Sequence, residues 1–237
     1  LIQIMGDLMA MNFLTGRFAP HEILGEMAIM AMMACLLGIL HAFLHEWGIA
    51  FLLGPNLMKP LLEKDSTVLQ SSLKTASQKA DAKNEDIKKW AHLAGSKKGN
   101  INVKLHTTVQ DLIMSIVSII LFVSYTYFMM DPNVNETPQS HINVSTPLSY
   151  FALRLHCGST LYEIFLYLHI GKDTIAYIHH FLVIGNFFRA LTRGKFHYYG
   201  AWLGTVEGTN PFLSSTFCMM RLNLIDHPLL TICTFGL

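Results

Sequence analysis

The sequence contains few charged residues. Asp, Glu, Lys and Arg make up only 14% of its 237 residues, whereas soluble domains contain about 25%. Hydrophobic residues account for 51% and lie in long apolar runs. The net charge of +1 also lacks the basic surplus that is typical of nucleic-acid-binding proteins. The composition therefore indicates an integral membrane protein and argues against nucleic acid as a partner.

Cysteine pairs and an initiator methionine are also absent. The four cysteines lie singly in apolar segments, without a C-x-x-C motif, and we interpret them as small core residues. The chain begins with Leu1 and stops inside an apolar run, so we expect both ends to lack material. No cysteine-based disulfide framework or metal site is indicated.

Hydrophobic periodicity predicts an all-α fold, namely a polytopic bundle of about five to six membrane-spanning helices that is truncated at its C-terminus. We interpret residues 1–22 as an amphipathic interfacial segment and residues 23–237 as the transmembrane domain. The expected spans are 23–53, 105–130, 148–170 and 173–191. An aromatic, glycine-interrupted segment follows at 197–212, where we expect a broken helix that faces the histidines, and then the start of another span.

Charge predicts the orientation of the bundle. The loop at 58–104 contains many lysines and no arginine, so by the positive-inside rule it faces the cytoplasm or its organellar equivalent. The connector at 131–147 has no Lys or Arg and carries sequons at Asn135 and Asn143, which places it on the opposite side. Three cations at the end of the fourth span would lie on this sequon side, contrary to the rule: Arg189, Arg193 and Lys195.

Polar residues inside the expected spans form helical faces. One stripe of the third span carries His156, Thr160, Glu163 and Tyr167. We expect His156 and Glu163 to make structural pairings. In the fourth span Asp173, Tyr177 and His180 share a face, and His179 points toward the side of Asn186. Because an ionisable group at bilayer depth costs roughly 2.5–3.5 kcal/mol, these groups should face a cavity or a partner.

Four blocks of residues occur in order between about residue 85 and the end of the chain. They are Trp90 with His106; Gly158, Tyr162 and Glu163; Lys172, Asp173, His179 and His180; and the run from Glu207 to Phe212. In this order the blocks resemble the TLC-domain family (TRAM–Lag–CLN homology) of polytopic helical membrane proteins. The similarity is greatest to the TLC-domain-containing subgroup rather than to the true ceramide synthases.

The resemblance implies a lipid-handling protein of the endoplasmic reticulum or endomembrane system. Ceramide synthases of this family transfer an acyl group from coenzyme A to a sphingoid amine and need the histidine pair. This chain departs from their pattern, since Asp173 stands six residues before His179 and Glu207 stands where an H-D-x-x-D block is expected. These departures separate it from ceramide synthesis itself.

Lipid binding or modification is the expected function, with acyl transfer by the histidine pair as the leading reaction. A neutral imidazole accepts a proton from an attacking amine or hydroxyl, and a carboxylate orients the ring. The predicted catalytic residues are His179, His180, Asp173 and Glu207, with Glu207 as the acid that faces the pair. The predicted lipid-binding residues are Tyr177, Asn186, Tyr162 and Glu163. No resident cofactor or metal is expected; acyl-coenzyme A would be the co-substrate.

Two alternatives from other classes stay open. The first is a non-catalytic accessory subunit of a larger membrane complex, for example a respiratory or photosynthetic one in a mitochondrial or plastid inner membrane. The second is a membrane di-iron hydroxylase or desaturase, suggested by His41 and His45 at helical i, i+4 spacing together with the histidine pair. The H-x-x-H-H blocks of such enzymes are absent.

Overall fold

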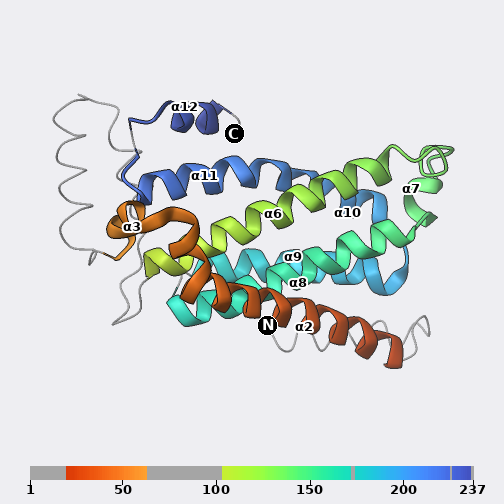
Figure 1. Cartoon of the computed structure of the whole chain (residues 1–237). Coiled ribbons are helices and arrows are strands. Elements are labelled where there is room, and N and C mark those ends of the chain that lie inside the picture. Colours follow the sequence, from red (N-terminus) through yellow and green to blue (C-terminus); the bar gives the residue numbers. More distant parts are fainter. Residues whose placement is uncertain (1–19, 63–102, 172–173, 225, 236–237) are drawn as a thin grey trace.

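A computed structural model describes residues 20–62, 103–171, 174–224 and 226–235 (Figure 1). Within these ranges the regular elements are helices and no strand occurs, which confirms the all-α prediction. The interfacial segment predicted at 1–22 and the lysine-rich loop lie almost wholly outside the described residues. The elements in order are α2 (Pro20–Phe43), the π-helical η1 (Leu44–Gly48), α3 (Ile49–Leu62), α6 (Val103–Met129), α7 (Ser140–Asn143), α8 (Pro147–Ile170), α9 (Thr174–Arg193), α10 (His197–Gly204), the 3₁₀-helical η2 (Thr205–Thr209), α11 (Asn210–Arg221) and α12 (Pro228–Phe235).

Two helical stretches are long and apolar enough to cross a membrane. They are Ile23–Gly54 and Val103–Met129, and a buried core helix can meet the same criteria of length and composition. The helices α8 and α9 agree in position with the spans predicted at 148–170 and 173–191, although their polar residues keep them below the same threshold. The count of five to six spans therefore stays a prediction.

Local sequence signals fix the two ends of α8. Thr146 caps its N-terminus, accepting from the Ser149 backbone N–H while the Ser149 hydroxyl accepts from the Thr146 N–H. Pro147 follows at the first helical position, where its missing N–H costs nothing. At the C-terminus Gly171 adopts a left-handed conformation (φ 75°) and its N–H donates to the carbonyl of Tyr167. These caps hold α8 in the register that decides which of its residues face inward.

The segment at 197–212, predicted to be a broken helix, consists of separate helical pieces in the structure. The interruption between α10 and α11 is only the 3₁₀ turn η2. The glycines of this segment serve close packing: a Cβ at Gly204 would overlap the ring of Tyr125, and one at Gly208 would lie 2.6 Å from the ring of Phe122. Both rings belong to α6, so the glycines bring the α10–η2 segment against that helix.

The helix α6 is the centre of the bundle. In Figure 1 it slants across the middle of the bundle, with α11 above its left half and α8 and α9 below it, and it packs directly on α8, α10 and α11. Its inward face repeats every three or four residues and is fully or almost fully buried: Val109, Ile113, Val117, Leu121, Tyr125 and Phe128. The first helix, α2, packs on α8, where Gly158 admits Met33.

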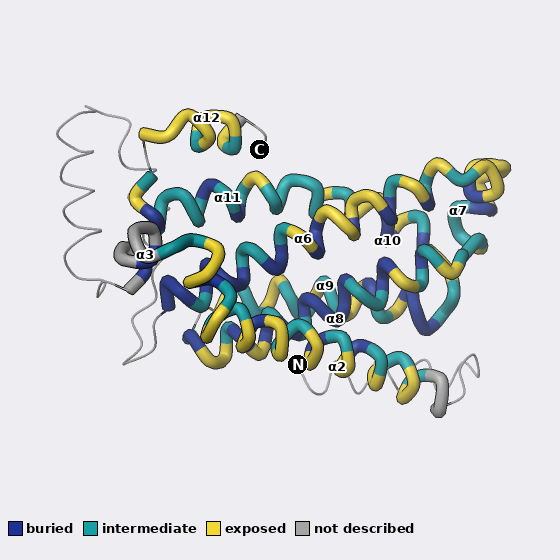
Figure 2. Tube along the Cα trace, in the orientation of Figure 1, coloured by how far each residue is buried: buried dark blue, intermediate teal, exposed yellow. Residues whose placement is uncertain are grey.

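The stretch from α2 through η1 into α3 leaves a large apolar surface uncovered, as Figure 2 shows by its long exposed portions. Trp47 and Phe51 are 74% and 90% exposed. The non-helical backbone of Gly54 (φ 69°, ψ 170°) then breaks the helix directly before Pro55. Beyond this break a further short helical stretch continues to Leu62.

A pair of glycine substitutions tests the close packing on α6. We expect Gly204→Ala to destabilise the fold by about 1–3 kcal/mol, because the new methyl group overlaps the buried ring of Tyr125. Gly185→Ala is the matched control, since a Cβ there meets nothing within 4 Å and alanine favours a helix by about 0.5–1 kcal/mol. Thermal unfolding of the purified variants measures both; equal midpoints would contradict the packing.

Candidate functional site

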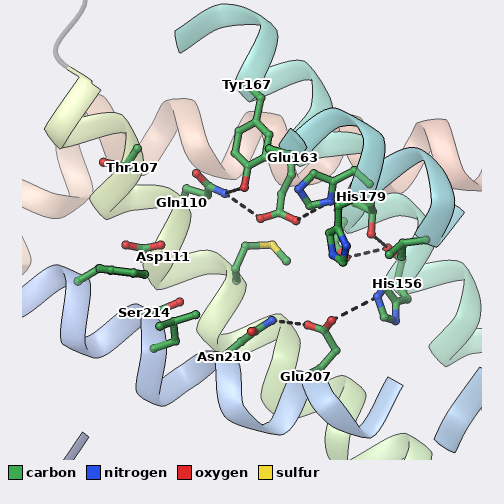
Figure 3. A pocket seen from close by; sticks show the side chains of 18 of the residues that line it. Thr107, Gln110, Asp111, His156, Glu163, Tyr167, His179, Glu207, Asn210 and Ser214 are labelled. Carbon is green, nitrogen blue, oxygen red and sulfur yellow. Dashed lines mark hydrogen bonds and ion pairs between the residues drawn. The ribbon is translucent and has the colours of Figure 1, made fainter. Parts of the chain in front are cut away.

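A cavity of about 530 Å³ lies among α6, α8, α9, η2 and α11 (Figure 3). This volume is within the range of small-molecule sites, roughly 300–1,000 Å³. Its wall combines histidines, carboxylates and hydroxyls with apolar side chains. The residues that define its chemistry are Gln110, Asp111, His156, Thr160, Glu163, Tyr167, His179, His180, Glu207, Asn210 and Arg221.

The first acid–imidazole pair joins α8 to α9. His180 Nδ1 lies 3.8 Å from a carboxylate oxygen of Glu163, and each side chain is almost buried. The other Glu163 oxygen accepts a hydrogen bond of 2.7 Å from the side-chain amide of Gln110, which also donates to the hydroxyl of Tyr167 at 3.1 Å. The carboxylate is thereby held on one side by α6, with its other oxygen toward the histidine. Figure 3 shows Glu163 between Gln110 and the helix that carries His179.

The second pair joins α8 to η2. His156 Nε2 lies 3.5 Å from Glu207, and its Nδ1 lies 3.0 Å from the hydroxyl of Tyr125. Glu207 accepts hydrogen bonds from Asn210 at 2.6 Å and from Ser118 at 3.1 Å. A neutral His156 with its proton on Nε2 fits this arrangement, because that N–H then points toward the carboxylate and Nδ1 accepts from the tyrosine.

An ion pair lies on the wall near the C-terminal end of α11. Arg221 donates through Nη1 to the carboxylate of Asp111, which links α11 to α6. The arginine side chain is only 8% exposed, and its buried Nε has no hydrogen-bond partner within the described structure. The guanidinium thus lies on the wall of the cavity that the histidines line, while its Nε is covered by protein atoms.

The polar stripe of the third span lies on the cavity wall. All four of its predicted members line the cavity, since α8 carries them at helical spacing: His156, Thr160, Glu163 and Tyr167. Both His179 and His180 line it as well. The sequence predicts that Glu207 is the acid facing His179 and His180. In the structure Glu163 is instead the acid beside His180, and Glu207 is the acid beside His156.

Four other predicted site residues do not reach the cavity or cannot be placed there. Tyr177 and Asn186 are absent from its wall, and Asn186 is exposed. The inward face of α9 runs instead through Ala176, His179, His180 and Val183. Tyr162 is buried but points to a different cluster. Asp173 lies outside the described residues.

That other cluster gathers histidines from three helices and η1, and we call His41, His45, His106 and His169 the histidine cluster. His41 bridges two groups, with Nδ1 2.7 Å from the Tyr162 hydroxyl and Nε2 3.0 Å from His106. The His106 ring stacks on His45 at 4.1 Å and meets the edge of His169 at 5.3 Å. A neutral imidazole donates at one nitrogen and accepts at the other, so His41 satisfies both neighbours.

The two histidine pairs on which the di-iron hypothesis depends lie in different parts of the structure. His41 and His45 belong to the histidine cluster, whereas His179 and His180 line the cavity. Among the described parts of the chain, no three or more His, Cys, Asp or Glu side chains are placed to hold a metal ion. The ligand geometry therefore does not support a shared iron centre.

Several residues of the cavity were missed at the level of sequence. Gln110, Ser118 and Asn210 hold the two carboxylates by hydrogen bonds. The sequence does contain a signal for Gln110 and Ser118. Both are polar residues inside the apolar stretch 105–130, where a polar side chain usually needs a partner. Asn210 belongs to the E-G-T-N-P-F block, but only the fold shows that its side chain reaches back one turn to Glu207.

Comparison of the chain with protein-family models, with curated proteins and with solved structures finds no match. The resemblance to the TLC-domain family therefore stays a proposal. The chemistry of the cavity is the basis on which a function can be assigned.

Replacing Glu207 tests the second pair. We expect Glu207→Leu to destabilise the fold strongly, because it leaves Asn210, Ser118 and His156 without their acceptor, and each unsatisfied buried group costs about 1–3 kcal/mol. Glu207→Gln keeps an amide oxygen for Asn210 and should retain most of the stability. Thermal unfolding of both variants measures the difference, and a Leu variant as stable as the Gln variant would contradict the network.

Proposed function

We propose that this chain is a polytopic, TLC-like membrane protein that binds a lipid in the cavity and transfers an acyl group to it. The single observation that carries the proposal is the convergence of two acid–imidazole pairs on one cavity, His180 with Glu163 and His156 with Glu207. Buried titratable pairs that line a cavity are typical of catalytic sites. The cavity wall also includes apolar side chains suited to an acyl chain, such as Leu213 and Val183.

The outer surface supports location in a membrane. Besides the two long apolar helices, α8 and α9 direct large apolar side chains outward; Phe165 and Leu168 are 59% exposed, and Ile178 and Leu182 are 53% and 63% exposed. Water disfavours so much contiguous apolar surface, whereas acyl chains do not. The endoplasmic reticulum or endomembrane is the location that the family resemblance favours, and a mitochondrial or plastid inner membrane is the alternative.

In the proposed reaction His180 is the general base. Its imidazole takes the proton of a lipid hydroxyl or amine while that oxygen or nitrogen attacks the carbonyl carbon of an acyl-coenzyme A thioester. Glu163 stabilises the imidazolium formed, for which the 3.8 Å separation needs to shorten by about 1 Å. The carbon–sulfur bond then breaks, and the coenzyme A thiolate takes the proton from the imidazolium, so that His180 returns to its neutral form.

His179 and Arg221 have supporting roles in this proposal. His179 lies next to the base on the same wall and serves to position the acyl carbonyl or the lipid head group. Arg221 serves as a positively charged group on the cavity wall for an anionic or carbonyl oxygen of the ligand. Asp173 and Tyr177 are left without a specific role.

The accessory-subunit alternative has one observation in its favour. The uncovered apolar face of α2, η1 and α3 includes the largely exposed side chains of Trp47 and Phe51. Such a face fits either acyl chains or the helices of a neighbouring subunit in a larger membrane complex. A subunit of that kind could keep the cavity as a lipid-binding site without turnover.

The test is acyl transfer by the purified chain reconstituted in lipid. Palmitoyl-coenzyme A is the donor, and a panel of lipids with free hydroxyl or amino groups supplies the acceptors. We expect His180→Ala to reduce turnover about 100-fold or more and Glu163→Gln to reduce it less, because the base is kept but loses its partner. His227→Ala is the matched control, since this exposed histidine lies before α12 and away from the cavity wall.

Unchanged turnover in His180→Ala would exclude this mechanism. A wild-type chain that shows no turnover on the panel, yet co-purifies with other membrane subunits, would replace the enzyme by the accessory-subunit function.

A further inference from the structure

The second acid–imidazole pair, His156 with Glu207, lines the cavity but has no part in the reaction described above. Glu207 Oε2 takes the hydrogen bonds from Asn210 and Ser118, whereas Oε1 faces His156 Nε2 at 3.5 Å. That separation exceeds the length of an N–H···O hydrogen bond, about 2.7–3.2 Å. Within the part of the chain that the structure describes, neither Oε1 nor Nε2 has a hydrogen-bond partner. The pair therefore leaves two polar atoms side by side at the cavity wall.

A neighbouring tyrosine decides which nitrogen of His156 carries the proton. The Tyr125 hydroxyl lies 3.0 Å from Nδ1 and 3.5 Å from the carbonyl of Ala152, so Nδ1 is its nearer acceptor. When Nδ1 accepts, a neutral imidazole carries its proton on Nε2. His156 Nε2 is then a donor, and Glu207 Oε1 beside it is an acceptor.

A hydroxyl group matches these two atoms, because a single oxygen both donates and accepts hydrogen bonds. Placed on the cavity side of the pair, it donates to Glu207 Oε1 and accepts from His156 Nε2. An ammonium group has donors only and leaves the Nε2–H without an acceptor. A phosphate or carboxylate group has acceptors only and meets the carboxylate of Glu207. The pair thus selects a neutral hydroxyl.

This hydroxyl position lies away from the catalytic base. His156 and Glu163 stand about two turns apart on α8, which is about 10 Å along the helix axis. Figure 3 shows Glu163 and Glu207 on opposite sides of the cavity. Since His180 lies beside Glu163, a hydroxyl at His180 and a hydroxyl at Glu207 are two different groups of the ligand. A ligand that fills both positions carries hydroxyls on different carbons.

We propose that the acceptor is a lipid with a polyhydroxyl head group. One hydroxyl attacks the thioester with His180 as its base, and a second is held between Glu207 and His156. The pair positions the head group and exchanges no proton during turnover. This assignment names the acceptor class of the acyl transfer in the previous subsection and rests on that function. Glycerol and sugar head groups have the required hydroxyls, whereas a simple alcohol or amine lacks the second one.

Two acceptors that differ by one hydroxyl test the proposal. They are 2-O-hexadecylglycerol and 2-O-hexadecylpropane-1,2-diol, in which a methyl group replaces one hydroxymethyl group. The donor is palmitoyl-coenzyme A, and the full chain is reconstituted in lipid. We expect kcat/KM to be about tenfold or more higher for the glycerol ether, because its second hydroxyl satisfies both polar atoms. This exceeds the statistical advantage of two equivalent hydroxyls.

Glu207→Gln tests the residue. Its amide oxygen keeps the bonds from Asn210 and Ser118 and its NH₂ group replaces the acceptor at the hydroxyl position, so the ratio of the two kcat/KM values should fall about fivefold or more. Glu163→Gln is the matched control. It removes the partner of the base for both acceptors alike, so both values should fall while their ratio stays. The wild-type comparison needs no variant and therefore decides the matter even if Glu207→Gln fails to fold.

Three outcomes would overturn the proposal. A wild-type ratio no larger than the statistical advantage would mean that water fills the position. A Glu207→Gln variant with the wild-type ratio would remove Glu207 from the site. A higher kcat/KM for the 3-amino analogue of the glycerol ether would make the position an ammonium site.

Retention of the two ethers by the detergent-purified chain, measured by native mass spectrometry, separates this inference from the proposed function. A wild-type chain that retains the glycerol ether in preference, and loses the preference in Glu207→Gln, keeps the hydroxyl site even without turnover. Absence of turnover with that preference intact would reject the acyl transfer alone.

Discussion

The burial of carboxylates inside an apolar helical bundle is the constraint on which this structure depends. Each buried acid needs hydrogen bonds or a cation, because an unpaired charge in such surroundings costs several kcal/mol. Glu207 obtains them from α6, α8 and α11, and Glu163 obtains them from α6 and α9. The same contacts fix the relative positions of these helices and leave a polar cavity between them. The residues that fix the packing of these helices are therefore the same residues that supply the polar groups of the cavity.

The helix α8 is the element that joins the polar regions. Neighbouring residues on it point in different directions: Tyr162 bonds to the histidine cluster, and Glu163 lines the cavity. Near its N-terminal end Arg154, two residues before His156, binds Glu26 of α2. This is possible because successive helical residues differ by about 100° in direction. One capped helix thus supplies side chains to three separate polar sites without a break in its backbone.

Close backbone approach complements these polar contacts. The segment that carries Glu207 reaches α6 because Gly204 and Gly208 have no side chain to hold it away from Tyr125 and Phe122. That approach brings the carboxylate of Glu207 to Ser118. The aromatic, glycine-interrupted composition of the segment predicts a broken helix when the sequence is considered alone. In the structure its glycines permit tight helix packing, which requires knowledge of the partner helix.

The sequence by itself determined the helical class, the approximate ends of α6, α8 and α9, and the polar stripe of α8, because apolar run length, caps and the 3.6-residue period are local properties. It also pointed to His179, His180 and Glu207. Only the tertiary structure decided which acid meets which imidazole, because His180 with Glu163 and His156 with Glu207 are contacts across helices. The tertiary structure likewise leaves Tyr177 and Asn186 off the cavity wall. The helical period allows several faces of α9 to point inward, and the packing of α9 on α8 selects one of them.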